Sequence, residues 1–234
     1  MKKLFLFYFL ISSISGFCQS LTGAQLLEKA IAFHDPNGNW ITFNNILKVT
    51  MTTPDAPVRV SNITINLPEH FFQVKATKEG ITTEYTINKD KCDIKLNGKS
   101  NLSEEDLKAN NLSCERANMY KNYYTYLYGL PMKLKDAGTI IHEKVETKTF
   151  KGKSYLRLKV TYDKTVGNDI WYFYFNPKTY ALEVYQFFHD EAKNDGEYIL
   201  LSGIETIDAI KMPKIRAWYT NKEENYLGTD TLEK

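Results

Sequence analysis

The stretch DIWYFYFNPKT, residues 169–179, decides the fold that this sequence predicts. Residues 170–175 are all aliphatic or aromatic, so both alternating faces of an extended strand carry large apolar side chains. A strand of that kind is covered on both faces. Residues 176–179 form a turn signal, and residues 182–188 have the composition of a returning strand. We expect a helix over one face and a ligand cavity at the other, although a thick aromatic core without a cavity explains the same composition.

Antiparallel strands are predicted on both sides of this stretch, because apolar and polar residues alternate with a period of two. They cover residues 41–52, 58–67, 70–77, 81–88, 91–96, 139–150, 155–162, 197–206 and 214–221. Val58 and Val60 follow one phase, whereas Ile63 and Ile65 follow the other. This change of phase predicts a β-bulge near Ser61-Asn62.

Two helical regions accompany the strands. Thr22 and Gln25 have the pattern of a capping box, and the helix that they begin must end before Pro36. Ser103 caps a short acidic segment, and Ser113 caps a helix that runs to Gly129. The second of these is crowded with phenols: Tyr120, Tyr123, Tyr124, Tyr126 and Tyr128. No repeat or linker divides the chain, so residues 19–234 are expected to form a single domain.

The first residues have the layout of a secretory signal peptide. Lys2 and Lys3 precede an apolar run over residues 4–14, and small residues follow. The run is too short for a transmembrane helix, which needs about 20 apolar residues, and no later segment approaches that length. The protein is therefore expected to be periplasmic or secreted.

The predicted leader spans residues 1–18, with cleavage after Cys18 and cleavage after Ser20 as the alternative. A lipoprotein anchor at Cys18 is disfavoured, because the residue before it is Phe17, which is large. The whole chain has 30 Lys and Arg against 28 Asp and Glu. Loss of Lys2 and Lys3 leaves 28 of each, and a neutral chain with scattered charges disfavours nucleic acid as a partner.

Two cysteines, Cys92 and Cys114, remain after cleavage. An exported protein meets an oxidising compartment, so we expect a disulfide between them, which would contribute about 3 kcal/mol through loop closure. Two buried, inert thiols are the alternative.

No constellation in the sequence indicates an enzyme, a metal site or a cofactor. The four histidines, His34, His70, His142 and His189, lack the spacing of a zinc site. The GxSxG, GxGxxG and P-loop patterns are absent as well. We therefore expect no catalytic residue and no cofactor.

The segment HDPNGNW, residues 34–40, has two interpretations. As a corner, Pro36 ends the helix and Asn37-Gly38 makes a tight turn, while Asp35 caps backbone amides. As a rim, His34 and Asp35 offer polar contacts to a ligand. We favour the corner and keep the rim as the alternative.

The order of elements, together with residues 169–182 and the later stretch IKMPKI at residues 210–215, resembles the LolA/LolB-like superfamily. In that group a strand reaches a tryptophan, turns through an Asn-Pro-Lys-Thr type corner and returns through a leucine. Within the superfamily the chain is similar to an uncharacterised family of secreted bacterial proteins with an HDPNGNW-like corner. The resemblance covers most of residues 21–225.

The resemblance implies an α+β fold. A strongly curved antiparallel sheet, or incomplete β-barrel, would carry an N-terminal helix, and a central helical insert would plug its mouth. It implies an exported soluble protein that binds a lipid or other apolar ligand, as lipid and lipoprotein carriers do. We expect the cavity to be lined by Tyr120, Tyr123, Tyr124, Leu127, Trp171 and Phe173. The alternative is an envelope protein-interaction or scaffold module with a filled core and no ligand.

Overall fold

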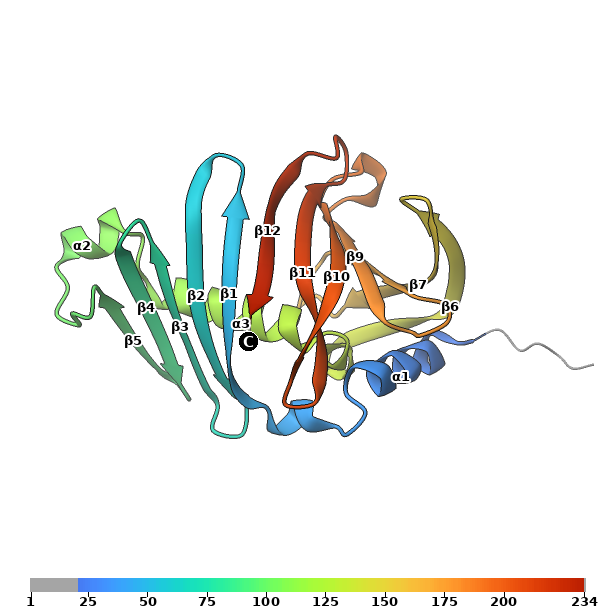
Figure 1. Cartoon of the computed structure of the whole chain (residues 1–234), viewed down its shortest axis with the longest axis horizontal. Coiled ribbons are helices and arrows are strands. Elements are labelled where there is room, and N and C mark those ends of the chain that lie inside the picture. The colour runs from blue at the N-terminus through green and yellow to red at the C-terminus, as the bar shows by residue number, and fades with distance from the viewer. Residues whose placement is uncertain (1–20, 234) are drawn as a thin grey trace, which may run out of the picture.

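The computed structural model describes residues 21–233. The predicted leader at residues 1–18 and the cleavage point after Cys18 or Ser20 lie outside the described residues. Within the described range, twelve antiparallel strands form one sheet (Figure 1). The strands are β1 Asn44–Thr53, β2 Ala56–Asn66, β3 Phe71–Lys78, β4 Ile81–Asn88, β5 Lys91–Leu96, β6 Thr139–Phe150, β7 Lys153–Tyr162, β8 Ile170–Phe175, β9 Leu182–Phe188, β10 Glu197–Ile207, β11 Ile210–Thr220 and β12 Tyr226–Glu233.

In residues 21–233, three α-helices and three short 3-10 helices accompany the sheet. They are α1 Gly23–His34, α2 Glu104–Ala109, α3 Cys114–Gly129, η1 Asn39–Thr42, η2 Met132–Lys135 and η3 Glu191–Lys193. The capping box predicted at α1 is present, since Thr22 and Gln25 each bind the other's backbone N–H. Gly23 is required there, because a Cβ on it would lie 2.0 Å from the His142 carbonyl oxygen of β6.

The strand order is β5-β4-β3-β2-β1-β12-β11-β10-β9-β8-β7-β6. Two meanders, β1 to β5 and β6 to β11, are therefore joined by β12, which pairs with β1 on one side and β11 on the other. Sequence patterning did not predict β12, and it placed the start of β11 four residues too late. The turn before β11 is instead at Asp208-Ala209, both of which have positive φ.

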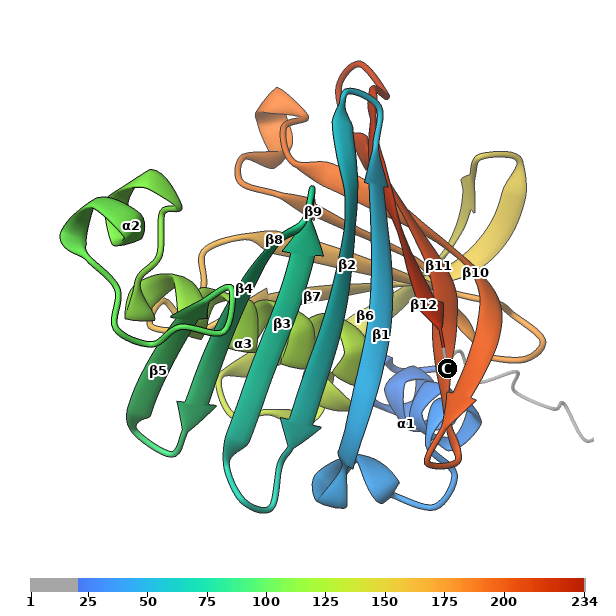
Figure 2. The same cartoon turned by 60° about the vertical axis from the view of Figure 1, so that its left-hand side comes forward.

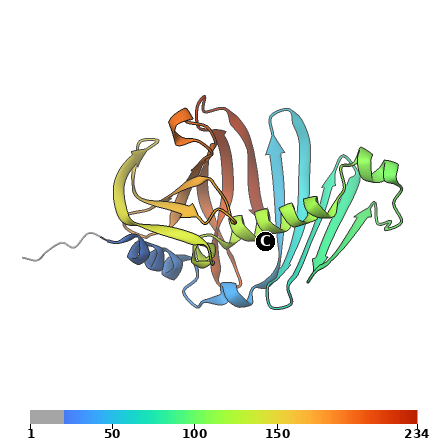
Figure 3. The ribbon, with the colours of Figure 1, turned by 180° about the vertical axis from the view of Figure 1, so that it is seen from behind.

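The α+β class, the antiparallel sheet, the N-terminal helix and the helical insert are as predicted, but the sheet is neither closed nor strongly curled. Helix α3 lies across one face of the sheet (Figures 2 and 3), so it does not plug a mouth. Its tyrosines contact strands far apart in the sheet: Tyr120 meets Tyr85 of β4, and Tyr126 meets Trp171 of β8. The 16-residue helix is about 24 Å long, which is enough to span several strands of the sheet.

Both faces of β8 are covered, as the WYFYF pattern predicts. The expected helix on one face and cavity on the other is wrong, because α3 and the cavity described below both lie on the face that carries Trp171. Phe173 and Phe175 belong to the main core between the sheet and the helices. Tyr172 and Tyr174 belong to a smaller cluster on the opposite face, where the Arg157 guanidinium lies 4.4 Å from the Tyr172 ring centroid.

The predicted bulge at Ser61-Asn62 is wrong, because β2 pairs in continuous register with β1 and β3 through those residues. The register irregularity lies instead between Met51 and Thr53 of β1. The apparent change of phase arises because Val58 is exposed, whereas Arg59 and Ser61 occupy the core-facing positions of β2.

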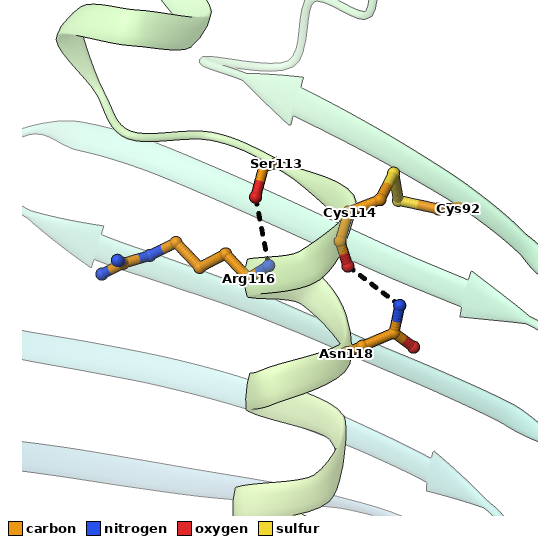
Figure 4. Close-up of a disulfide and its surroundings, with 5 residues drawn as sticks. All are labelled: Cys92, Ser113, Cys114, Arg116 and Asn118. Atoms are coloured by element: carbon orange, nitrogen blue, oxygen red, sulfur yellow. Dashed lines mark hydrogen bonds between the residues drawn. A yellow bond between two sulfur atoms is a disulfide. The ribbon is translucent and has the colours of Figure 1, made fainter.

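Cys92 of β5 and Cys114, the first residue of α3, form a disulfide with a Cα–Cα distance of 5.9 Å (Figure 4). Ser113 caps the helix beside it by accepting a hydrogen bond from the Arg116 backbone N–H at 3.2 Å. The bond fixes the N-terminal end of α3 to the β5 edge of the sheet. The other end of α3 lies over the second meander.

Candidate ligand cavity

A cavity of about 660 Å³ lies between the C-terminal half of α3 and the second meander. Cavities of roughly 300–1,000 Å³ are typical of small-molecule sites. Six aromatic side chains from α3, β7, β8, β9 and β11 form most of its apolar wall: Tyr123, Tyr126, Tyr162, Trp171, Phe187 and Trp218. Leu127 of α3 adds an aliphatic contact.

The aromatic wall is held by ring–ring contacts. Trp171 of β8 stacks on Phe187 of β9 with ring centroids 4.9 Å apart, and Tyr126 of α3 meets Trp171 edge-on at 5.5 Å. At the other side, Tyr123 of α3 stacks on Trp218 of β11 at 6.1 Å. These rings are only half-buried, so part of the surface of each ring remains open to a molecule in the cavity.

Two phenols close the wall near β7. The hydroxyls of Tyr126 and Tyr162 are hydrogen-bonded to each other. Burial raises the pKa of Tyr162 to about 12 and raises the pKa of Tyr126 well above its ordinary value. Both hydroxyls are therefore neutral at physiological pH, and this part of the wall is apolar apart from one internal hydrogen bond.

The cavity rim carries two charge pairs. Lys133 and Asp136 form an ion pair, and His189 Nδ1 lies 2.7 Å from the Asp169 carboxylate. The hydrogen bond to Asp169 raises the pKa of His189. Each charged rim group is thus engaged by a neighbour.

Glu197, the first residue of β10, differs from the rim groups. Within residues 21–233, no hydrogen bond or ion pair reaches its carboxylate, although it lines the cavity. Burial raises its pKa, and His189 opposes that rise. In sheet register Glu197 lies opposite Phe187, and Phe187 lies opposite Trp171. The carboxylate and the two rings therefore form one row along the cavity floor.

A second cavity, of about 290 Å³, lies on the other side of the stacked pair Tyr123 and Trp218. These two residues and Glu197 line both cavities. The second cavity also meets Asp230 of β12, which is 3% exposed. Burial raises the pKa of Asp230, while Arg216 and Arg59 oppose the rise.

Beneath α3, four polar residues occupy core-facing positions of the sheet: Arg59 and Ser61 of β2, Arg216 of β11 and Asp230 of β12, which we call the polar stripe. The Arg59 guanidinium donates to the Tyr124 hydroxyl at 3.2 Å. The Arg216 guanidinium lies 3.9 Å from the Tyr128 ring centroid and donates to the Pro213 carbonyl at 2.8 Å. The phenols of α3 thus cover the polar stripe, and neither arginine lines a cavity.

Of the six residues predicted to line the cavity, the structure brings Tyr123, Leu127 and Trp171 to it. Phe173 is 0% exposed and Tyr124 is 1% exposed, so both are buried in the core. Tyr120 lies away from the cavity, between Tyr85 and Tyr124.

Sequence reasoning missed Glu197, Phe187 and Trp218 as cavity residues. A signal for Phe187 was available, because the turn at residues 176–181 sets β9 opposite β8 and places Phe187 beside Trp171. No local signal marks Glu197 or Trp218, since their place depends on how α3 crosses the sheet.

His34 and Asp35 lie at the corner between α1 and η1, and neither lines the two cavities. His34 is fully buried: its Nδ1 donates to the Lys211 carbonyl at 2.5 Å, and its Nε2 accepts from the Leu182 N–H at 2.9 Å. Burial lowers its pKa to about 4. The Asp35 carboxylate accepts from the Asn39 and Trp40 N–H groups at 2.8 and 2.9 Å. These bonds suit the corner interpretation.

None of the helices in residues 21–233 has the length and apolar character that crossing a membrane requires. In the same part of the chain, His, Cys, Asp and Glu side chains nowhere gather in a group of three or more that could hold a metal ion.

The pattern of one protein family, described as "Family of unknown function (DUF6503)", matches residues 2–234. The chain belongs to this family. No curated protein matches the sequence.

Solved structures of other proteins are similar in fold to this DUF6503 chain. A LolA superfamily protein from Nitrosomonas europaea superposes with a TM-score of 0.54 at 10% identity, covering 92% of this chain and 93% of that one. A domain assigned to outer membrane lipoprotein sorting from Vibrio parahaemolyticus gives a TM-score of 0.48 at 11% identity, covering 91% and 92%. The chain therefore has a LolA superfamily-like fold, as its sequence motifs indicate.

Proposed function

We propose that this protein is an exported binding protein that holds a lipid or other apolar ligand between α3 and the second meander. The observation that carries the proposal is the cavity of about 660 Å³ with its wall of six aromatic side chains. Burying apolar ligand surface against such a wall contributes about 25 cal/mol per Å² removed from water. The similarity in fold to a LolA superfamily protein adds support by analogy alone.

Two features of the protein support the export that this proposal includes. The leader at residues 1–18 directs the chain out of the cytoplasm, and the disulfide between Cys92 and Cys114 suits an oxidising compartment. We place the mature protein, as a single domain from residue 19, in the periplasm or outside the cell. A non-catalytic role fits this cavity, because the charged side chains at its rim are paired and do not point together at one position where a substrate could react.

The open cavity favours this role over that of a scaffold module with a filled core. The first test is native mass spectrometry, with organic extraction, of the exported protein purified without detergent. We expect a retained apolar compound, and binding of the neutral fluorescent probe N-phenyl-1-naphthylamine after extraction. A protein that carries no compound, takes up no probe and co-purifies with a stoichiometric partner protein would support the scaffold role instead.

A pair of valine substitutions locates the binding. Val166 lines the cavity and is 58% exposed, so Val166→Trp narrows the opening without disturbing the core. Val58 of β2 is 50% exposed and lines neither cavity, so Val58→Trp is the matched control. We expect Val166→Trp to weaken probe binding and Val58→Trp to leave it unchanged. Equal effects of the two substitutions would place the ligand elsewhere.

A further inference from the structure

We propose that the ligand is an amphiphile with a positively charged ammonium group, which binds between the aromatic rings and the carboxylate of Glu197. The inference rests on the proposed function, because it names the ligand class for the same cavity. It is carried by the position of one unpaired carboxylate among aromatic faces.

The carboxylate of Glu197 is open to a ligand. The other charged side chains of the cavity are paired, Lys133 with Asp136 and His189 with Asp169, and the phenols Tyr126 and Tyr162 are bonded to each other. Within residues 21–233 the Glu197 carboxylate has no such partner, although β10 places it in the same cross-strand row as Phe187 and Trp171. A half-buried anion without a partner gains stability from a cation that fills the cavity.

The aromatic faces favour the same charge. The ring faces of Trp, Tyr and Phe are electron-rich, so they attract a cation that lies within about 6 Å of the centroid. Trp218 and Tyr123 stand on one side of Glu197, and Phe187 and Trp171 stand on the other. Aromatic rings around a carboxylate form the kind of cage that recognises ammonium groups.

The distribution of charge disfavours an anionic head group. The lining of the cavity holds three carboxylates, those of Asp136, Asp169 and Glu197, against Lys133 and His189, and both of these basic groups are already engaged by Asp136 and Asp169. The half-buried Arg59 and the buried Arg216 face the phenols of α3 and line neither cavity.

The volume of the cavity requires more than a head group. Glu197 and Trp218 lie where the two cavities meet, whereas Tyr162, Val166 and Thr139 lie at the far part of the larger one, towards β6 and β7. That part has the neutral hydroxyl pair and no unpaired charge, so it suits the apolar portion of the ligand. The chemistry is shared by lipids with an ammonium head group and by free alkylammonium compounds.

The test is isothermal titration of the extracted protein with matched probes below their micelle concentrations. Dodecyltrimethylammonium combines head and tail, 1-dodecanol has the tail alone, and dodecanoate replaces the cation with an anion. Lysophosphatidylcholine distinguishes a lipid head group from a free alkylammonium. We expect dodecyltrimethylammonium to bind about tenfold more tightly than 1-dodecanol, and dodecanoate to bind more weakly than both.

Two variants separate the contribution of charge from that of shape. Glu197→Gln keeps the size of the side chain and should remove most of the preference for the cation while leaving 1-dodecanol binding unchanged. Glu205→Gln is the control on the same strand, because Glu205 lies 3.7 Å from Lys214 and lines neither cavity. Trp218→Leu should reduce the same preference, whereas Trp218→Phe should retain part of it.

The outcomes distinguish this inference from the proposed function. Equal binding of 1-dodecanol and dodecyltrimethylammonium overturns the ammonium inference and leaves the apolar binding role intact. A preference for the cation that survives Glu197→Gln overturns the role of Glu197. If none of the four probes binds, the proposed function fails as well.

Discussion

Acidification should destabilise the protein through His34, a residue far from the cavity. The imidazole is fully buried and neutral, because its pKa is about 4 in the folded protein against an ordinary value of 6.5. Burial is the main cause, and the positive charges of Lys211 and Arg216 add to it, while the Lys211 carbonyl opposes it. The unfolded chain therefore binds a proton at His34 at a higher pH than the folded protein does.

The sign and size follow from this difference. Stability from His34 is fully present above pH 6.5 and is lost as the pH falls from about 6.5 to about 4, because the unfolded state then binds more protons. A pKa lowered from 6.5 to about 4 corresponds to about 3 kcal/mol of unfolding free energy across that window. The loss is a substantial fraction of the roughly 5–15 kcal/mol that stabilises a typical domain.

The assay is urea denaturation of the wild type and His34→Gln at several pH values from 7.5 to 4. At pH 7.5 the variant should be less stable by about 1–3 kcal/mol, because glutamine cannot keep both bonds to Lys211 and Leu182. On acidification the wild type should lose about 3 kcal/mol more than the variant does. Carboxylates such as Glu146, with a pKa lowered to about 2, affect both proteins equally. A difference between the two proteins that stays constant with pH would refute the reasoning.

Further predictions concern the disulfide, the core and the cavity. Replacing Cys92 and Cys114, 22 residues apart, with serine should lower the unfolding free energy by about 3 kcal/mol, with a fall of roughly 6–12 °C in Tm measured by calorimetry. Phe173→Ala should cost about 3–5 kcal/mol in urea denaturation, since the side chain is 0% exposed. Titration of dodecyltrimethylammonium should show weaker binding as the pH falls, because burial raises the pKa of Glu197 and the carboxylate becomes protonated. In Glu197→Gln, only the pH dependence that comes from protonation of His189 should remain.

The strands with regular alternation were predictable from the sequence, and β12 was not. Its core-facing residues are Gly228, Asp230 and Leu232, of which only Leu232 is apolar. An apolar alternation therefore never forms. Leu227 is apolar but exposed, so it suggests that residues 227, 229 and 231 face the core, whereas residues 228, 230 and 232 do so.

The false bulge in β2 has the same cause. Arg59 and Ser61 point into the molecule because the phenols of α3 above them need polar partners. A sequence pattern treats a polar residue as a solvent-facing one, and it fails where a polar helix covers a polar stripe. The crossing of α3 over the sheet is a tertiary feature, so local patterns could not separate Tyr123 and Leu127, which line the cavity, from Tyr120 and Tyr124, which do not, and they could not predict the place of Glu197.

The central position of β12 has a consequence for how the chain folds. β1 to β5 and β6 to β11 can each form from neighbouring segments, but β1 and β11 acquire their shared neighbour only when residues 226–233 have been synthesised. Until then the molecule has two partial sheets, each with an additional unpaired edge that another chain could join. In the export that we propose, that order delays completion of the sheet until the last strand has emerged.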